Sequence, residues 1–380
     1  MTRSIRAALP LAALLAAGCG GSGDGSGPST GDARAEAPAA ERVVASVVTD
    51  ALDAPWALAF LPDGRMLVSE RRGGLRIVAP SGATRAVRGA PAVADADQGG
   101  LLDVAISPEF ARDATVFLAY AEPADGGART AVARAVLDGD AIRDLRVIFR
   151  QRPALPGGEH FGSRLAFARD GTLFVTLGDR QRREGARDLR SHLGKVVRIR
   201  ADGGVPPDNP FVGRADALPE IWSFGHRNPQ GATIEPSSGA LWTSEHGPRG
   251  GDEIDAPVPG GDFGWPEVGY GREYDDGSPI GPTSRAGVVE PLHVWTPVSV
   301  APSGMTFATT DRVPGWRGDL FVGALAGRTL VRLDVEGGRV VGEQRLLTGL
   351  GERIRDVAES PDGTLHLVTD SGRLMRVEVR

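Results

Sequence analysis

The chain is 380 residues long, which is enough for two or three domains or for one large all-β unit. Its hydrophobic content of 41% supports a sizeable core, and its 53 glycines and 28 prolines favour many turns over long helices. The net charge of −6 at pH 7 gives no reason to propose nucleic acid as a partner.

Residues 1–18 have the pattern of a secretory signal peptide. Arg3 and Arg6 precede an apolar run, residues 7–17, that is too short to span a bilayer stably. The run leads into LAAGC, which resembles the lipobox of bacterial lipoproteins, where the peptide is cut before a cysteine that carries a lipid. We therefore expect lipidation at Cys19 and a place on the periplasmic side of a bacterial cell envelope, held to the membrane only by this anchor. The alternative is an ordinary secretory signal with a chance cysteine.

Cys19 is the only cysteine of the chain, so the mature protein has no disulfide framework. Residues 19–41 are rich in Gly, Ser, Ala, Asp and Pro, a composition typical of a flexible tether that buries nothing. The remaining residues, 42–380, are expected to form one catalytic domain.

One pattern recurs from Val43 onward: an apolar residue, a short turn with Pro, Asp or Gly, and then an alternating strand. The six examples are FLPDGRMLVSE (60–70), ISPEFARDATVFLAY (106–120), FARDGTLFVTLGD (167–179), IEPSSGALWTSEHG (234–247), the stretch 305–335 with GDLFVGAL, and ESPDGTLHLVTD (359–370). Most are followed by a second candidate strand, at 75–78, 196–200, 329–333 and 374–379.

Repeats of this length, each holding several strands, predict an all-β fold, a six-bladed β-propeller with four-stranded antiparallel blades. The N-terminal run RVVASVV (42–48) is expected to pair with the C-terminal strands and close the ring. A pair of β-sandwiches is the alternative, but six similar units divide poorly between two sandwiches. In a propeller, loops from distant parts of the sequence converge at one mouth of the central channel.

The stretch 223–266 is dense in glycine, proline and polar residues and cannot be a regular helix. Five of its polar side chains fall within a short distance in sequence: Glu245, His246, Asp252, Glu253 and Asp255. Carboxylates and free carbonyls in such loops suit a hard cation such as calcium. The preceding arginine and amide, at positions 227 and 228, suit an anionic or carbonyl-bearing ligand. The alternative is a well-solvated acidic loop.

Two further segments carry candidate chemistry. His160 lies in a Gly-rich loop and would be a competent general base, with Asp179 placed to orient it. Alternatively, this histidine caps backbone groups of its loop. Arg353 and Arg355 point the same way in an extended chain and suit a polycarboxylate, although an exposed charged strand would look the same.

Five motifs taken together resemble one family. GEHFGSRL, GHRNPQG, EHGPRGGDEI, GGDFGWP and RIRDV occur in the chain in this order and are similar to those of the glucose/sorbosone dehydrogenase family. Its members are soluble quinoproteins that use pyrroloquinoline quinone (PQQ) and Ca²⁺ on a six-bladed propeller. The likeness spans residues 43–380 and is closer to the periplasmic aldose sugar dehydrogenases than to the soluble glucose dehydrogenase.

The resemblance implies roles for individual residues. His160 matches the proton acceptor, Asp179 its orienting carboxylate, and Arg227 a group at the reactive carbonyl of the quinone. The residues that match cofactor contacts are Gln98, Arg227, Asn228, Tyr274, Ala324, Leu325, Ala326, Arg353, Ile354 and Arg355. The calcium ligands implied are the carbonyls of Gly247 and Pro248 at the catalytic ion, and Glu253 with the carbonyl of Phe263 at another.

The implied activity is oxidation of aldose sugars at C1 to lactones. His160 would take the proton of the anomeric hydroxyl, hydride would pass to the quinone, and a cytochrome or quinone would accept the electrons. One alternative is a calcium-dependent propeller lactonase or esterase, which would not need Arg353 and Arg355. Another is a non-catalytic sugar-binding propeller, which would be expected to lose His160 or Arg227.

The chain departs from the family at one basic position. The soluble glucose dehydrogenase has a lysine in the segment matching 323–327, where Ala326 stands here. Lys195, the only lysine of the chain, lies in a predicted strand of another unit. The positive charge facing the three carboxylates of PQQ is therefore expected to come from Arg227, Arg353 and Arg355.

Overall fold

The computed structural model describes residues 42–380. The predicted signal peptide (1–18), tether (19–41) and lipidation site Cys19 lie outside the described residues. Within the described part, no helix is both long enough and apolar enough to cross a membrane.

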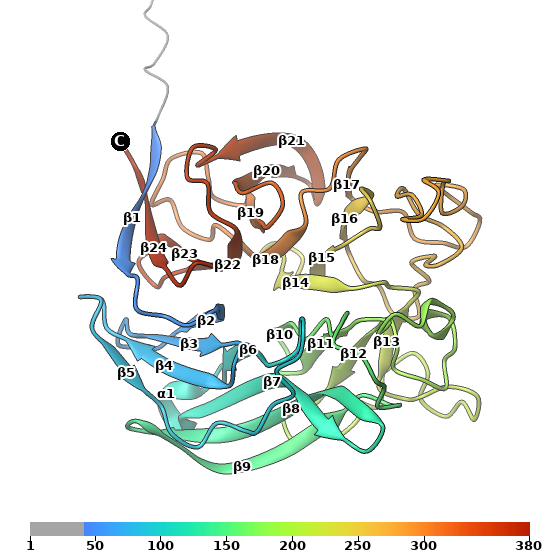
Figure 1. Cartoon of the computed structure of the whole chain (residues 1–380), viewed down its shortest axis with the longest axis horizontal. Helices are drawn as coiled ribbons and strands as arrows, with labels where there is room; N and C mark the ends of the chain where they lie inside the picture. The colour runs from blue at the N-terminus through green and yellow to red at the C-terminus, as the bar shows by residue number, and fades with distance from the viewer. Residues whose placement is uncertain (1–41) are drawn as a thin grey trace, which may run out of the picture. The chain divides into compact units, whose positions relative to one another are not determined.

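Residues 42–380 form six antiparallel sheets of four strands each, arranged as blades around a common axis (Figure 1). The innermost strands of neighbouring blades contact one another all the way round, in the order β2, β6, β10, β14, β18, β22 and back to β2. The predicted six-bladed β-propeller is therefore confirmed, and all six repeats seen in the sequence belong to blades.

The strands follow in chain order within each blade. Blades 1 and 2 consist of β2 (Pro55–Phe60), β3 (Met66–Glu70), β4 (Gly74–Val78), β5 (Thr84–Ala86), β6 (Leu101–Ile106), β7 (Thr115–Ala124), β8 (Gly127–Asp138) and β9 (Ala141–Arg150). Blades 3 and 4 consist of β10 (Leu165–Phe167), β11 (Leu173–Leu177), β12 (Lys195–Ile199), β13 (Ile221–Phe224), β14 (Pro229–Ile234), β15 (Leu241–Glu245), β16 (Asp252–Asp255) and β17 (His293–Trp295). Blades 5 and 6 consist of β18 (Pro302–Phe307), β19 (Leu320–Ala324), β20 (Leu330–Glu336), β21 (Arg339–Leu346), β22 (Ile354–Glu359), β23 (Leu365–Thr369), β24 (Leu374–Val379) and β1 (Val43–Thr49). The described helices are α1 (Phe110–Asp113) and the 3₁₀ turn η1 (Arg183–Ala186).

The ring is closed by the two ends of the described chain. Strand β1 pairs antiparallel with β24, with Val43 opposite Val379. The backbones of Arg42 and Arg380 exchange two hydrogen bonds, of 2.9 and 3.0 Å. The predicted pairing of residues 42–48 with the C-terminal strands is confirmed.

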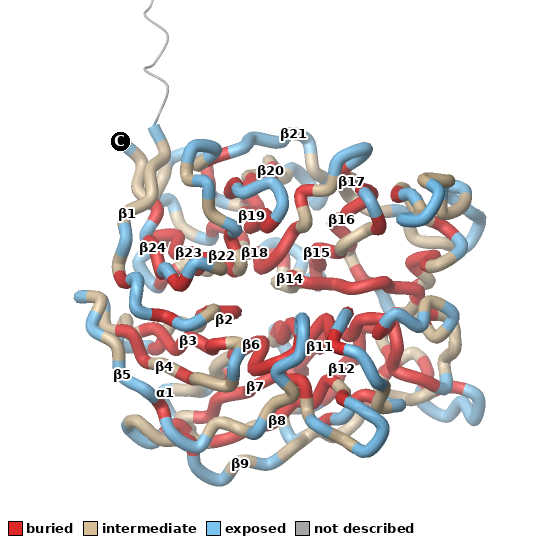
Figure 2. Tube along the Cα trace, in the orientation of Figure 1, coloured by how far each residue is buried: buried red, intermediate tan, exposed pale blue. Residues whose placement is uncertain are grey.

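The core is a set of apolar layers between neighbouring blades. Each blade interface holds its own buried cluster, and Figure 2 shows the buried segments concentrated on the inner strands. The second strands β3, β11, β15, β19 and β23 are buried along their whole length, because both of their faces pack against other blades. The outermost strands, such as β21, are largely exposed.

Side chains near the axis also link each blade to the next by a hydrogen bond. The six links run from Ser69 to the Leu102 carbonyl, from the Leu165 amide to Asp103, from Thr176 to the Pro229 carbonyl, from Ser244 to the Ser303 carbonyl, from Ser303 to the Ile354 carbonyl, and from the Leu58 amide to Asp356. These links fix the ring of innermost strands whose entry loops carry the candidate site.

Candidate functional site

The candidate site lies where loops of all six blades open at one end of the ring. The loops that enter the innermost strands and those that follow the second strands meet at this end, because neighbouring strands in a blade are antiparallel. A cavity of about 360 Å³ is lined there by side chains of every blade. Its walls include Trp56, Gln98, Phe161, His246 and Leu325.

One wall of this cavity is basic. Arg353 and Arg355, on the strand entering blade 6, both line it and both bind Asp370, which also lines it. Arg353 Nε lies 2.8 Å from Asp370 Oδ2, and Arg355 Nε lies 2.9 Å from Asp370 Oδ1. The two guanidiniums thus share one side, as an extended backbone requires, and Asp370 neutralises part of their charge.

A second, smaller cavity of about 30 Å³ adjoins the first through His246, which lines both. The four residues predicted to hold calcium all line the smaller cavity: Gly247, Pro248, Glu253 and Phe263. Arg227 lines it too, and donates a hydrogen bond of 3.0 Å from Nη1 to the carbonyl of His246. The structure therefore brings together oxygen groups that are separated in the sequence.

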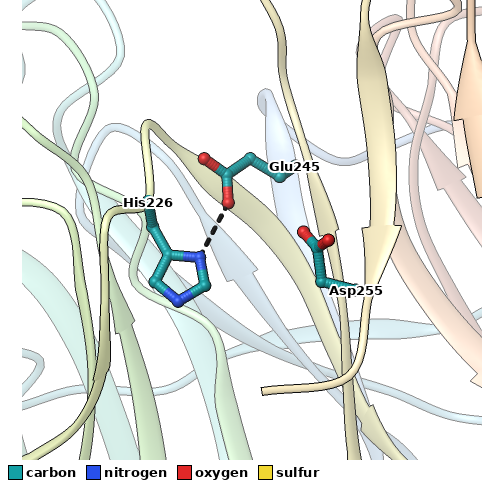
Figure 3. Close-up of side chains that lie close together, drawn as sticks. All are labelled: His226, Glu245 and Asp255. Carbon is teal, nitrogen blue, oxygen red and sulfur yellow. Dashed lines mark hydrogen bonds and ion pairs between the residues drawn. The ribbon is translucent and has the colours of Figure 1, made fainter. Parts of the chain in front are cut away.

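The carboxylates of Glu245 and Asp255 lie close together beside His226 (Figure 3), and Glu245 lines the smaller cavity. Glu245 on β15 pairs with Glu253 on β16, and Asp255 follows two residues later on the same face. Among the described residues, neither carboxylate oxygen of the buried Asp255 has a hydrogen-bond partner. Burial, reinforced by the neighbouring carboxylates, raises the pKa of Glu253 and of Asp255 well above its usual range. A cation would relieve this uncompensated negative charge.

Two other acidic residues near this cavity, Glu245 and Asp252, accept hydrogen bonds from other groups of the protein. Glu245 accepts hydrogen bonds from the backbone amides of Arg227 and Asn228 and from Nδ1 of His226, the last at 3.0 Å. Asp252 accepts from the Gly247 amide at 3.0 Å and from two groups of the loop before β18. Both carboxylates therefore hold loops in place.

His160 and Asp179 form a buried pair on two loops of blade 3. His160 Nδ1 lies 2.7 Å from Asp179 Oδ1, and both side chains are buried. Burial is the largest single effect on Asp179 and works against its charge, but His160, Arg227 and Trp265 together outweigh it, so the pKa of Asp179 is lowered. Trp265 adds a 2.8 Å hydrogen bond to the other oxygen of Asp179. A carboxylate held in this way fixes the orientation of the imidazole.

Neither His160 nor Asp179 itself lines the two cavities; each is linked to one of them by a neighbour. Gln98, in the wall of the larger cavity, accepts a 3.0 Å hydrogen bond from the His160 amide. Trp265, in the wall of the smaller cavity, binds Asp179. Each member of the pair is therefore one residue removed from a cavity wall.

The remaining predicted cofactor contacts are placed differently. Leu325 lines the larger cavity, whereas Ala324 and Ile354 are buried in apolar clusters between blades. Asn228 is buried and accepts a hydrogen bond from the Gly162 amide at 3.1 Å. Tyr274 is 61% exposed and lines neither cavity, and Ala326 is exposed as well. The structure does not bring these two side chains to the cavity walls, and their contact with a cofactor stays a prediction.

Lys195 cannot stand in for the lysine that is missing at Ala326. Its side chain is fully buried below the surface of blade 3, where Nζ donates to the carbonyls of Gly185, Ala186 and Leu193 at 2.7–2.9 Å. The basic groups that do line the larger cavity are Arg71 and the two arginines of blade 6.

Asp370 and Trp265 also belong to the site but were not predicted from the sequence. Asp370 had a signal, because an acidic residue stands at or just after the end of the second strand in its unit, as Asp179, Glu70 and Glu245 do in theirs. Trp265 had none, since its contact with Asp179 depends on a long loop whose path is set by a hydrogen bond from the Trp265 amide to the Gly225 carbonyl.

Known proteins of one family are similar to this chain over most of its length. A family model described as "Glucose / Sorbosone dehydrogenase" matches residues 52–376. Aldose sugar dehydrogenase YliI of Escherichia coli (strain K12) is 45% identical over 355 residues, which cover 90% of this chain and 94% of that protein. Quinoprotein glucose dehydrogenase B of Acinetobacter calcoaceticus is 31% identical over 255 residues, covering 59% and 52%. The solved PQQ-bound aldose sugar dehydrogenase of Streptomyces coelicolor superposes with a TM-score of 0.74 at 30% identity, covering 89% of this chain and 99% of that one.

Proposed function

The chain belongs to the glucose/sorbosone dehydrogenase family, and we propose that it oxidises aldose sugars at C1 to lactones with PQQ and Ca²⁺. Its relatives support the broader statement that it is a sugar dehydrogenase, an oxidoreductase. The observation that supports the finer proposal most strongly is the meeting of a basic cavity, an oxygen-lined cavity and the His160–Asp179 pair at one end of the ring.

The larger cavity fits a polycarboxylate cofactor. PQQ carries three carboxylates, and Arg71, Arg353 and Arg355 all line this cavity. Guanidinium groups bind carboxylates with paired hydrogen bonds. A PQQ-bound structure in a relative at 30% identity supports the same assignment.

The smaller cavity fits Ca²⁺. Hard cations take carbonyl and carboxylate oxygens, and Gly247, Pro248, Glu253 and Phe263 line this cavity. The uncompensated carboxylates of Glu253 and Asp255 in the same region favour a divalent ion.

When bound, the quinone would accept the hydride from C1 of the sugar, and Ca²⁺ would polarise its carbonyl. The protein's own contribution is to place a base and a positive charge beside the reacting atoms. His160, held by Asp179 through Nδ1, would take the proton of the anomeric hydroxyl on Nε2. Arg227, anchored on the His246 carbonyl, would stabilise negative charge that develops on oxygen. The electrons would then leave to a cytochrome or a quinone.

A reconstitution assay tests this proposal. Apo-protein is supplied with PQQ and Ca²⁺ together or with each omitted, and dye reduction by glucose and other aldoses is followed with identification of the product. We expect turnover and lactone only when both cofactors are present. Hydrolysis of lactones or esters without PQQ would instead assign the protein to the lactonase alternative, and sugar binding without either reaction would assign it to the binding-module alternative.

A further inference from the structure

Both ring nitrogens of His160 are occupied in the structure. Nδ1 faces Asp179, and Nε2 lies 3.2 Å from Nε2 of Gln181. An ionised carboxylate only accepts hydrogen bonds, so Nδ1 carries the proton and Nε2 is the acceptor. The amide of Gln181 therefore donates to the nitrogen that a general base must use.

Gln181 has a second acceptor for the same amide group. Its side-chain nitrogen also donates to Glu159 Oε2 at 2.8 Å, and its backbone amide donates to Asp179 Oδ1 at 2.9 Å. Gln181 and Glu159 are both exposed, whereas the His160 side chain is only 7% exposed. The amide can therefore leave Nε2 and stay bound to Glu159, so that only Nε2 needs a new donor.

The backbone that presents Gln181 is held in a disfavoured conformation. Arg180 and Gln181 have φ of +52° and +61°, in the left-handed region that side chains other than glycine seldom adopt. The buried guanidinium of Arg180 donates to the carbonyls of Glu159, Ala128 and Gly157 at 2.6–2.8 Å, and it lies 3.8 Å from the Phe161 ring. Arg180 thereby fastens the loop of the base to the turn that carries Gln181.

We propose that Gln181 is a positioning residue that caps Nε2 of His160 in the free protein and gives way to the hydroxyl of the substrate. The identity of that hydroxyl rests on the proposed function, but the cap itself does not. While it is in place, the cap keeps the imidazole in the tautomer with Nδ1–H and shields Nε2 from water and from other acids. Substrate binding exchanges one donor at Nε2 for another.

The charges around His160 make Gln181→Glu an informative variant. The groups that face the imidazole region are the acids Asp179 and Glu159 and the arginines Arg180 and Arg227. Glutamate has the shape of glutamine and keeps the backbone bond to Asp179. It places a carboxylate in place of a donor, however, and so favours the protonated imidazole.

The first test needs neither cofactor nor sugar. Apo-protein is treated with diethyl pyrocarbonate, which acylates unprotonated imidazole, and the modification rate of each of the six histidines is measured by peptide mass spectrometry. Gln181→Ala should raise the rate at His160 about tenfold, the scale of one lost hydrogen bond, and leave the other histidines unchanged. Gln344→Ala, at an exposed glutamine of β21, is the matched control and should behave as wild type. An unchanged rate at His160 in Gln181→Ala would overturn the proposal, whatever the enzyme oxidises.

The second test uses the holoenzyme and the pH profile of kcat/KM. In Gln181→Glu, the acidic limb should move to higher pH by about one pH unit, with kcat on the plateau nearly unchanged. If Gln181 had a purely structural role, the substitution would lower kcat on the plateau and leave the acidic limb at its wild-type pH. That result would contradict the proposal that Gln181 caps Nε2. If wild-type holoenzyme oxidises no sugar, the proposed function is wrong. The acylation experiment alone then tests whether Gln181 caps Nε2 of His160.

Discussion

At the scale of single residues, Asp370 is the counter-charge of the basic wall of the larger cavity. It binds Arg353 and Arg355 at once and keeps them on one side of the cavity. It also cancels one of their charges before any anion arrives. The pair of arginines therefore gains order from Asp370 at the expense of net charge.

We predict that Arg355→Ala weakens PQQ binding by about 10²-fold or more, because it strands a buried ligand carboxylate. Asp370→Asn should not weaken binding to that extent, since it leaves both guanidiniums in the wall. The measurement is titration of apo-protein with PQQ at fixed Ca²⁺.

Arg345→Ala, on the exposed strand β21, serves as the control for loss of an arginine and should leave the midpoint unchanged. If Arg355→Ala reconstitutes at the wild-type midpoint, the carboxylates of the cofactor are held elsewhere.

Site residues could be predicted from the sequence where both partners belong to one repeat unit. His160 and Asp179 lie on two loops of the same blade, so a propeller brings them together once the unit is recognised. Gln181 and Trp265 were not predictable, because their contacts depend on left-handed turns and on a long loop that the strand pattern does not describe.

At the scale of elements, strands β15 and β16 and their connecting loop supply most of the oxygen groups of the smaller cavity. Glu253 and Asp255 share one face of β16, and Gly247 and Pro248 lie in the loop before it. Two partly or fully buried carboxylates on one short strand repel each other unless a cation lies between or beside them.

We predict that Ca²⁺ raises the melting temperature of the apo-protein and that Glu253→Gln reduces this rise. A ligand at about 100 times its Kd stabilises the folded state by about 2.7 kcal/mol. Thermal unfolding is followed after chelation, with and without added Ca²⁺.

Glu336→Gln, at the exposed end of β20, removes an acid far from the smaller cavity and should respond to Ca²⁺ as wild type does. Equal shifts in wild type and Glu253→Gln would remove Glu253 from the calcium site.

The inner strands were easier to predict from the sequence than the outer ones. The second strands lie between turns with Asp, Gly or Pro and are rich in apolar residues, so they stand out in the sequence. Apart from β1, the fourth strands were not predicted from the sequence, since β5 and β17 have three residues each and β21 is mostly exposed. Short edge strands carry little hydrophobic pattern because few of their side chains are buried.

At the scale of the whole molecule, one arginine on the axis joins most of the ring. Arg164, entering blade 3, binds Asp103 of blade 2 at 3.3 Å and Asp356 of blade 6 at 3.0 Å. It also donates to the carbonyls of Gln230 and Arg355 and lies 4.1 Å from the Trp56 ring. Trp56 and Arg355 line the larger cavity, so Arg164 contacts both a wall of the cavity and the blades that close the propeller.

We predict that Arg164→Met destabilises the protein by about 3–5 kcal/mol, because it leaves two buried carboxylates without a counter-charge. Arg198→Met is the matched control. Arg198 is as buried as Arg164 and also bridges two aspartates, but its partners Asp170 and Asp208 are 53% and 68% exposed, against 8% for each partner of Arg164. Denaturant unfolding should show a clearly smaller loss for Arg198→Met.

The pH dependence of this loss has a definite sign. Burial raises the pKa of Asp103 to about 7, and it raises the pKa of Asp356 as well. A carboxyl with a raised pKa in the folded state stabilises it at low pH, and that stability is lost as the pH rises through the folded value. The destabilisation by Arg164→Met should therefore be smaller at pH 5 than at pH 8, and the opposite order would contradict the assigned network.

His160 is the proposed base for sugar oxidation in the site at the mouth of the ring. The most direct measurement mixes PQQ- and Ca²⁺-loaded protein with glucose without oxygen or dye and follows the absorption of the bound quinone. Wild type should reduce its quinone within one turnover, whereas His160→Gln should bind the cofactor normally and reduce it at least ~10²-fold more slowly. Reduction by His160→Gln at the wild-type rate would contradict the account.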